Sequence, residues 1–185
     1  ALLVTPAAAE RGQKGDWELG GYGGEGFPDS YEPDTGPALN PDDGWLYGAR
    51  FGYFMTNAWS LEGSIQRFGT RTSYDQALGL DNEDINIRSY RLNVLYNFMA
   101  GKGMRPYVTA GLGREITGGD APVTGSDLGI NAGGGVRWYL GKYFGLRLDA
   151  RLNRIGYDSD NFSSQNNLEA NVGVLWSFGG EPAGP

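Results

Sequence analysis

The sequence predicts an all-β fold, an eight-stranded antiparallel up-and-down β-barrel. Three observations predict it. Apolar and polar residues alternate with the period of a β-strand, in segments of about ten residues. The connections between these segments are alternately short and long, as in a barrel whose strands run up and down. No apolar run approaches the roughly 20 residues of a membrane-spanning helix, so insertion into a membrane would have to use strands.

Eight segments show this alternation. Their ranges are Lys14–Gly26, Trp45–Phe54, Trp59–Phe68, Ile87–Phe98, Pro106–Ile116, Asp127–Leu140, Phe144–Ile155 and Asn167–Phe178. In the first segment the alternation starts at Asp16 and places Glu18 on the polar face. The second segment opposes aromatic residues and alanine to Gly48, Arg50 and Gly52.

The third to fifth segments carry charges within otherwise small polar faces. The third has a carboxylate, Glu62, in the middle of its polar face. The fourth alternates Tyr, Leu, Val and Phe with a face that contains Arg91. The fifth opposes valine, alanine and leucine to threonine, glycine and Glu115. Each segment therefore has one face suited to apolar surroundings and one suited to a polar space.

The last three segments repeat the pattern most clearly. In the sixth, the apolar face from Leu128 to Leu140 alternates with a glycine-rich face that contains Arg137. The seventh opposes leucine, alanine and phenylalanine to arginine, aspartate and asparagine. The eighth has valine, leucine and two aromatic residues on one face and Glu169 on the other.

The connections separate the two ends of the predicted barrel. Three are short enough for tight turns: Met55–Ala58, Met99–Arg105 and Gly141–Tyr143. Four are long, polar and rich in Gly, Pro, Asp and Asn: Phe27–Gly44, Gly69–Asn86, Thr117–Ser126 and Gly156–Asn166. An even number of strands places both termini at the short-turn end.

The orientation of the faces decides between two kinds of barrel. Alternation alone fits a soluble barrel with an apolar interior as well as a membrane barrel with an apolar exterior. Eight strands leave an interior just wide enough for side chains, so the many Trp, Tyr, Phe and Leu residues would not fit inside. The polar face is mostly Gly, Ser, Thr and Asn, which suits a narrow lumen. We therefore expect a transmembrane β-barrel with short periplasmic turns and long extracellular loops.

Aromatic residues gather near the short turns. The predicted membrane-interface aromatic residues are Tyr53, Trp59, Tyr96, Phe98, Tyr107, Trp138, Phe144, Trp176 and Phe178. Such a girdle is typical of a barrel that crosses a membrane, although a soluble barrel can also place aromatic residues near its turns. Trp45 and Tyr90 lie nearer the long loops.

Charges on the inward face nearly cancel, with five arginines and five carboxylates. The predicted pore-lining residues are Glu18, Arg50, Glu62, Arg91, Glu115, Arg137, Arg147, Asp149, Arg151 and Glu169. In one interpretation they satisfy each other in a confined polar core, because an unpaired buried charge is costly. In the other they form a gate, whose opening would give a narrow water path.

Position along the strands divides most of these charges into two groups. The group near the short turns is Glu18, Arg50, Glu62, Arg137 and Arg147. The higher group is Arg91, Arg151, Glu115 and Glu169. Because Glu18, Arg50 and Glu62 lie on consecutive strands, we expect a chain of ion pairs across the floor of the lumen.

Composition argues against several functions. The chain has no cysteine and no histidine, which excludes disulfides, Cys/His zinc sites, thiol nucleophiles and a Ser-His-Asp triad. Its formal net charge of -7 gives little support for nucleic-acid binding. We expect no enzyme activity, catalytic residue, metal site or cofactor, because an arginine near each inward carboxylate makes it a poor general acid.

The two ends of the chain differ from residues 10–180, the predicted barrel domain. Residues 1–9 (ALLVTPAAA) have the apolar stretch and the small residues Ala7 and Ala9 of a signal-peptide cleavage site. They are interpreted as a signal-peptide remnant or as a disordered start. Residues 181–185 have the composition of the start of a Pro-rich linker.

Three stretches resemble a known family. Leu46–Thr56, Arg105–Gly113 and Val172–Gly180 are similar to the N-terminal eight-stranded barrel domain of OmpA-type outer-membrane proteins, closest to the OprF porin subgroup. The likeness extends roughly from Asp16 to Gly180. It implies export through the periplasm to the bacterial outer membrane. It also implies an envelope structural anchor and a narrow, low-conductance porin-like channel for small solutes or ions.

The resemblance also implies partners. The end of the chain resembles the signal read by the barrel-assembly machinery, with Asn171, Gly173, Trp176 and Phe178 in the matching positions. Outer-membrane lipid and lipopolysaccharide would surround the barrel. Family members commonly continue into a periplasmic domain that binds peptidoglycan. That domain is absent from this sequence, so a peptidoglycan link is implied only through such a domain.

The long loops are strongly acidic and suggest an alternative function. Their acidic residues are Asp29, Glu32, Asp34, Asp42, Asp43, Asp75, Asp81, Glu83, Asp84, Asp120, Asp158 and Asp160, against one cation, Arg71. They are interpreted either as solvated loops or as sites for divalent cations that bridge to lipopolysaccharide phosphates. A surface adhesin or receptor that acts through these loops is the alternative function.

Overall fold

The computed structural model describes residues 11–28, 40–41, 44–73, 83–99, 103–119, 125–156 and 165–180. The predicted signal-peptide remnant and the start of the linker lie outside these ranges. Most acidic positions of the long loops also lie outside them, and the side chains of Arg71, Glu83 and Asp84 are not described.

Nine strands account for nearly all of the described residues. They are β1 (Asp16–Pro28), β2 (Asn40–Pro41), β3 (Gly44–Phe54), β4 (Trp59–Ser73), β5 (Glu83–Asn97), β6 (Met104–Gly119), β7 (Gly125–Tyr139), β8 (Phe144–Gly156) and β9 (Gln165–Gly179). The two residues of β2 pair only with Thr72 and Ser73 of β4, and the other eight strands form the barrel. Among the described residues, no helix is long and apolar enough to cross a membrane.

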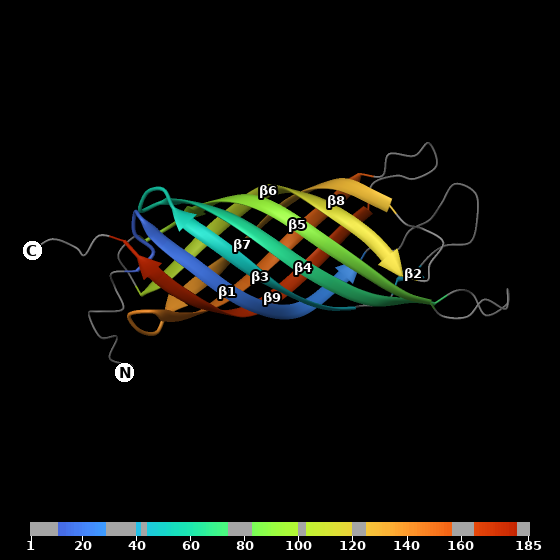
Figure 1. Ribbon diagram of the computed structural model, residues 1–185, viewed down its shortest axis with the longest axis horizontal. Coiled ribbons are helices and arrows are strands. Elements are labelled where there is room, and N and C mark those ends of the chain that lie inside the picture. The colour runs from blue at the N-terminus through green and yellow to red at the C-terminus, as the bar shows by residue number, and fades with distance from the viewer. Residues whose placement is uncertain are drawn as a thin grey trace, which may run out of the picture.

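The eight long strands close on themselves. Their order is β4-β3-β1-β9-β8-β7-β6-β5, every pairing is antiparallel, and β5 pairs back onto β4. Figure 1 shows the strands inclined to the long axis, with the start of β1 beside the end of β9 at one end of the barrel. The predicted eight-stranded antiparallel barrel is confirmed. Closure leaves no unpaired strand edge within the barrel, which a lipid environment requires.

Most strand boundaries differ from the predicted ones by one or more residues, and two of the differences have a clear physical cause. The β4–β5 ladder continues to the pair Thr72 and Glu83, well into the predicted loop Gly69–Asn86. Backbone hydrogen bonds sustain a strand pair without apolar alternation, so the periodicity ends before the ladder does. At the other end, β1 begins at Asp16 rather than Lys14. Gly15 has a φ of 85° and the amide of Asp16 donates to the carbonyl of Gln13, which makes a turn before the strand.

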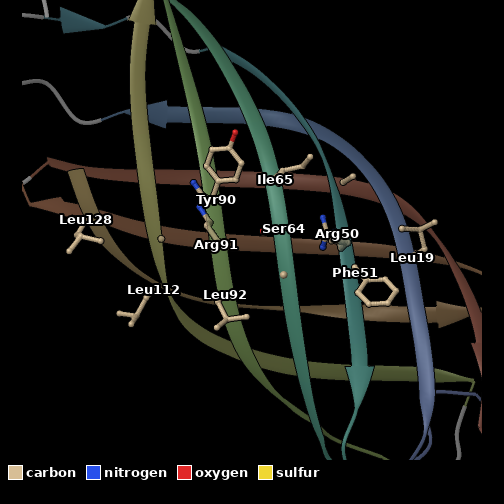
Figure 2. A pocket seen from close by; sticks show the side chains of 13 residues that line it. Leu19, Arg50, Phe51, Ser64, Ile65, Tyr90, Arg91, Leu92, Leu112 and Leu128 are labelled. Atoms are coloured by element: carbon tan, nitrogen blue, oxygen red, sulfur yellow. The ribbon is translucent and has the colours of Figure 1, made fainter. Parts of the chain in front are cut away.

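The two faces of the barrel have the predicted polarity. On the outside, Leu128 is 75% exposed and many other large apolar side chains are more than a third exposed. Figure 2 shows Phe51 and Leu92 standing on the outer surface, with the guanidinium groups of Arg50 and Arg91 on the inner side of the sheet. The buried face is mainly polar and charged. The apolar surface is therefore available to lipid and the polar side chains fill the lumen.

Candidate functional site: the interior of the barrel

All ten predicted pore-lining residues lie inside the barrel. Each is no more than 7% exposed, because alternation on eight closed strands directs every second side chain inward. Their ion pairs form three layers, which we call lower, central and upper, counted from the short turns.

The lower layer joins β1 to β7. Arg137 Nε lies 3.0 Å from Glu18 Oε2, and the hydroxyl of Tyr139 donates a hydrogen bond to the same carboxylate. Arg137 also donates to the side-chain oxygen of Asn97, and its guanidinium lies 4.7 Å from the centre of the Tyr107 ring. Glu18 thus pairs across the lumen.

The central layer contains three arginines and two carboxylates. Glu62 pairs with Arg147 and, at 2.9 Å, with Arg151. Asp149 pairs with Arg50 at 2.9 Å and with Arg151 at 3.0 Å. Arg151, assigned to the higher group from its position in the sequence, therefore bridges the two carboxylates of this layer. Arg50 lies with its guanidinium 3.9 Å from the centre of the Tyr22 ring.

The upper layer is built around Arg91. Its two terminal nitrogens lie 2.7 and 2.8 Å from the two carboxylate oxygens of Glu169, a bidentate ion pair. Arg91 also lies 3.2 Å from Glu115. Gln66 donates to Glu169 at 2.9 Å and accepts a hydrogen bond from the Tyr22 hydroxyl at 3.1 Å. The layer has one arginine for two carboxylates, the reverse of the excess in the central layer.

The prediction that Tyr107 lies at the membrane interface is wrong. Tyr107 is 2% exposed, and its hydroxyl accepts a hydrogen bond of 2.7 Å from Arg147 Nε inside the lumen. Its position near a short turn predicted an outward ring. Alternation excludes that, because Tyr107 shares the inward face of β6 with Thr109 while Val108 faces out.

The other eight predicted interface residues lie on the outer surface. They are Tyr53, Trp59, Tyr96, Phe98, Trp138, Phe144, Trp176 and Phe178. Several pack edge to face or tilted, with ring centres 4.9 Å apart for Trp59 and Tyr96 and 5.0 Å for Phe144 and Trp176. Their role at the membrane interface stays a prediction.

The sequence did not reveal what lies across the short-turn end. Residues 11–15, which we call the strap, cross this end and are held by Arg105, which is 0% exposed. Arg105 donates to the backbone carbonyls of Arg11 at 3.0 Å, Gly12 and, at 2.7 Å, Asn57. Arg11 in turn pairs with Asp16 at 3.1 Å. Arg105 was assigned to a turn, although it shares the inward parity of Tyr107.

Loss of Arg105 is expected to release the strap without unfolding the barrel. In the variant Arg105→Ala, amide hydrogen exchange of Gly12 to Asp16 should speed up, because three hydrogen bonds to backbone carbonyls disappear. The matched control is Arg114→Ala, whose side chain is on the outer surface. Equal exchange in the two variants would contradict the strap's dependence on Arg105.

The upper end of the lumen contains apolar side chains. Tyr22, Leu46 and Phe68 are buried together, and Ile87 packs against them. Beside Phe68 and Ile87 the interior has a cavity of about 20 Å³, room for about one water molecule. The interior is thus crossed by the strap at one end, by an apolar cluster at the other and by ion pairs between. Among the described residues, no group of His, Cys, Asp and Glu is arranged to hold a metal ion.

Comparison with known proteins gives two results from sequence. Residues 1–178 match a family described as the outer membrane protein beta-barrel domain. The chain is also 29% identical, over 168 residues, to outer membrane porin F of Pseudomonas aeruginosa. That alignment covers 87% of this chain and 45% of the relative, so the chain spans about half of the relative's length.

Solved structures share the fold. The N-terminal β-barrel domain of Pseudomonas aeruginosa OprF is 21% identical with a TM-score of 0.56, covering 89% of this chain and 98% of that one. OprG of the same organism is 15% identical with a TM-score of 0.68, covering 90% and 97%. Neisserial surface protein A is 17% identical with a TM-score of 0.65, covering 89% and 98%.

Proposed function

Because the chain belongs to the outer membrane protein beta-barrel domain family, we propose that it anchors the cell envelope and conducts small ions weakly through a lumen closed by ion pairs. The resemblance to OmpA-type proteins of the OprF subgroup is confirmed by the family match, the 29% identity and the shared barrel. The protein is an outer-membrane β-barrel.

The observation that carries the proposal is the paired and filled interior. Three layers of ion pairs connect strands on opposite sides of the lumen and restrain the barrel. Such a lumen suits an anchor, and opening it for ions requires the pairs to rearrange. The side-chain amides of Asn93, Asn131 and Asn153 are buried without hydrogen-bond partners among the described residues. Buried amides of this kind favour water or ions as their partners in the space between the layers.

A catalytic role is not proposed. Within the described interior, each carboxylate of the three layers has an arginine partner, and the chain has no histidine. Carboxylates held in ion pairs are poor proton donors. The adhesin or receptor alternative depends on loops that lie largely outside the described residues.

Two partners of the barrel are also proposals: the barrel-assembly machinery and peptidoglycan. We propose that the barrel-assembly machinery reads the last strand through Asn171, Gly173, Trp176 and Phe178, which all lie on β9. Trp176 and Phe178 are exposed on the outer surface, where a partner can reach them. A peptidoglycan link would require a further domain of the kind that the resemblance implies.

Single-channel recording tests the channel part of the proposal. In planar bilayers the unmodified barrel should show rare, small openings, and Arg50→Ala should raise the conductance. Removing Arg50 clears space beside Tyr22 and leaves two arginines facing two carboxylates, so the charges of the central layer become balanced. The control is Arg154→Ala, on the outer surface. Conductance unchanged by Arg50→Ala would reject the gate, and no openings at all would reject the channel.

A further inference from the structure

Two arginines face outward side by side on the barrel wall. Arg67 of β4 and Arg88 of β5 are register partners, and both are exposed on the outer surface. Like charges directly opposite each other destabilise a strand pair, and an arginine on the lipid face is costly. Within the part of the chain that the structure describes, no carboxylate forms an ion pair with either of them. An anion from outside the described residues would remove this repulsion.

The arginine pair lies at a second aromatic belt. Tyr47 is the register partner of Arg67, and Tyr90 lies on the same outward face of β5 as Arg88. Tyr47, like Trp45, is on the outer surface in the half of the barrel nearer the long loops, and Tyr90 is on the outer surface at the middle of β5. Tyrosine and tryptophan mark the headgroup level at each membrane interface. Since the other aromatic belt lies by the short turns, this one marks the extracellular leaflet.

Below the arginines the surface is hollowed. A depression of about 380 Å³ is bordered by Tyr47, Arg67 and Arg88. It shares Ala49, Ile65 and Tyr90 with a larger apolar groove of about 610 Å³. The floor of this groove is Gly63, and a Cβ placed there would meet no atom within 4 Å. Figure 2 shows Phe51 and Leu92 rising on either side of β4 at this place. Cationic and apolar surfaces are therefore continuous along the wall.

We propose that this continuous surface binds one phosphorylated lipid of the outer leaflet, the lipid A part of lipopolysaccharide. A phosphate lies between Arg67 and Arg88, where guanidinium forks form charge-assisted hydrogen bonds with phosphate oxygens. One acyl chain lies in the groove over Gly63, between Phe51 and Leu92. The tyrosines border the headgroup. The assignment depends on the outer-membrane location of the barrel and not on conduction through its lumen.

A second outer groove supplies a matched control. It has a volume of about 640 Å³ and is bordered by Ala150, Ala170 and Val172 on the opposite wall. The charged side chain exposed at its border is the carboxylate of Glu25. A groove of similar size and apolar character but opposite charge should not retain a phosphorylated lipid.

Native mass spectrometry of the purified barrel in detergent, titrated with lipid A, tests the proposal. The double variant Arg67→Gln, Arg88→Gln should weaken binding at least about tenfold, since hydrogen bonds between charged groups are lost. Gly63→Leu, which fills the groove, should weaken it as well. The controls Arg154→Gln and Ala150→Leu should bind like the unmodified barrel. Heat-modifiable gel mobility verifies that each variant is folded.

Four results would overturn the proposal. The first is equal binding by the unmodified barrel and the double arginine variant. The second is an equal loss in Arg154→Gln, which would indicate general attraction by positive charge. The third is displacement of lipid A by millimolar inorganic phosphate together with normal binding by Gly63→Leu, which would indicate a simple anion site. Equal affinity for dephosphorylated lipid A would reject the phosphate contact.

Discussion

Replacement of Glu62 by glutamine is expected to lower the free energy of unfolding of the barrel by about 3–5 kcal/mol. Glu62 is buried and pairs with both Arg147 and Arg151. Without its charge, the three arginines of the central layer face only Asp149. Removing one partner of a buried pair costs more than the pair is worth, because the remaining charge stays desolvated. Glutamine preserves the shape of the side chain, so the loss reports the charge.

Urea unfolding of the barrel in phospholipid vesicles, followed by tryptophan fluorescence, measures this loss. The control is Glu25→Gln, which removes a carboxylate from the exposed outer surface of β1. A surface charge contributes little, so this control should change stability by less than about 1 kcal/mol. Equal stability of the two variants would show that the central layer does not depend on Glu62.

The same substitution also changes what the lumen attracts. With Glu62→Gln the central layer carries two uncompensated positive charges, so any residual conductance should shift toward anions. Adding Arg151→Met removes one of these charges and is expected to restore part of the lost stability. Arg151→Met alone completes the comparison, and a double variant whose loss of stability equals the sum of the two single losses would mean that the two residues are not energetically coupled.

The number of strands and the direction of each face could be predicted from the sequence because the lipid outside and the lumen inside both select side chains with the two-residue period of a β-strand. Lipid selects apolar side chains on one face and a narrow lumen selects small or paired polar ones on the other. The alternation therefore continues through each strand as long as it lies in the membrane. Beyond this level only backbone pairing acts, which is why the continuation of β4 beyond Phe68 to Ser73 was missed. Tyr107 was misplaced when closeness to a turn was given more weight than parity.

The partners of the ion pairs could not be predicted in the same way. Glu18, Arg50 and Glu62 lie on strands adjacent in the barrel, but they pair with β7 and β8 rather than with each other. Their levels depend on the stagger of neighbouring strands, which alternation does not specify. Long arginine side chains then reach across the lumen, so Arg91 of β5 contacts Glu169 of β9. The sequence predicts the charge balance of the interior but not which side chains form ion pairs with each other.

Addition of one methyl group at Gly135 is expected to destabilise the barrel by about 1–3 kcal/mol, through overpacking of the inner face of β7. A Cβ there would lie 2.2 Å from the carbonyl oxygen of Leu148 and 2.5 Å from the hydroxyl oxygen of Tyr107. The backbone oxygen cannot swing away, so β7 and β8 must separate. Displacement of the Tyr107 hydroxyl would also break its hydrogen bond with Arg147.

Gly135→Ala should therefore show a lower urea midpoint and lose its folded, heat-modifiable gel band at a lower temperature. The control is Gly21→Ala on the outer face of β1, where a Cβ would meet nothing within 4 Å. At an open position of this kind, alanine reduces the entropy of the unfolded chain, so the control should be neutral or slightly more stable. If both variants lost stability equally, glycine would be required on the inner wall for a reason other than the close approach of β7 to β8 and Tyr107.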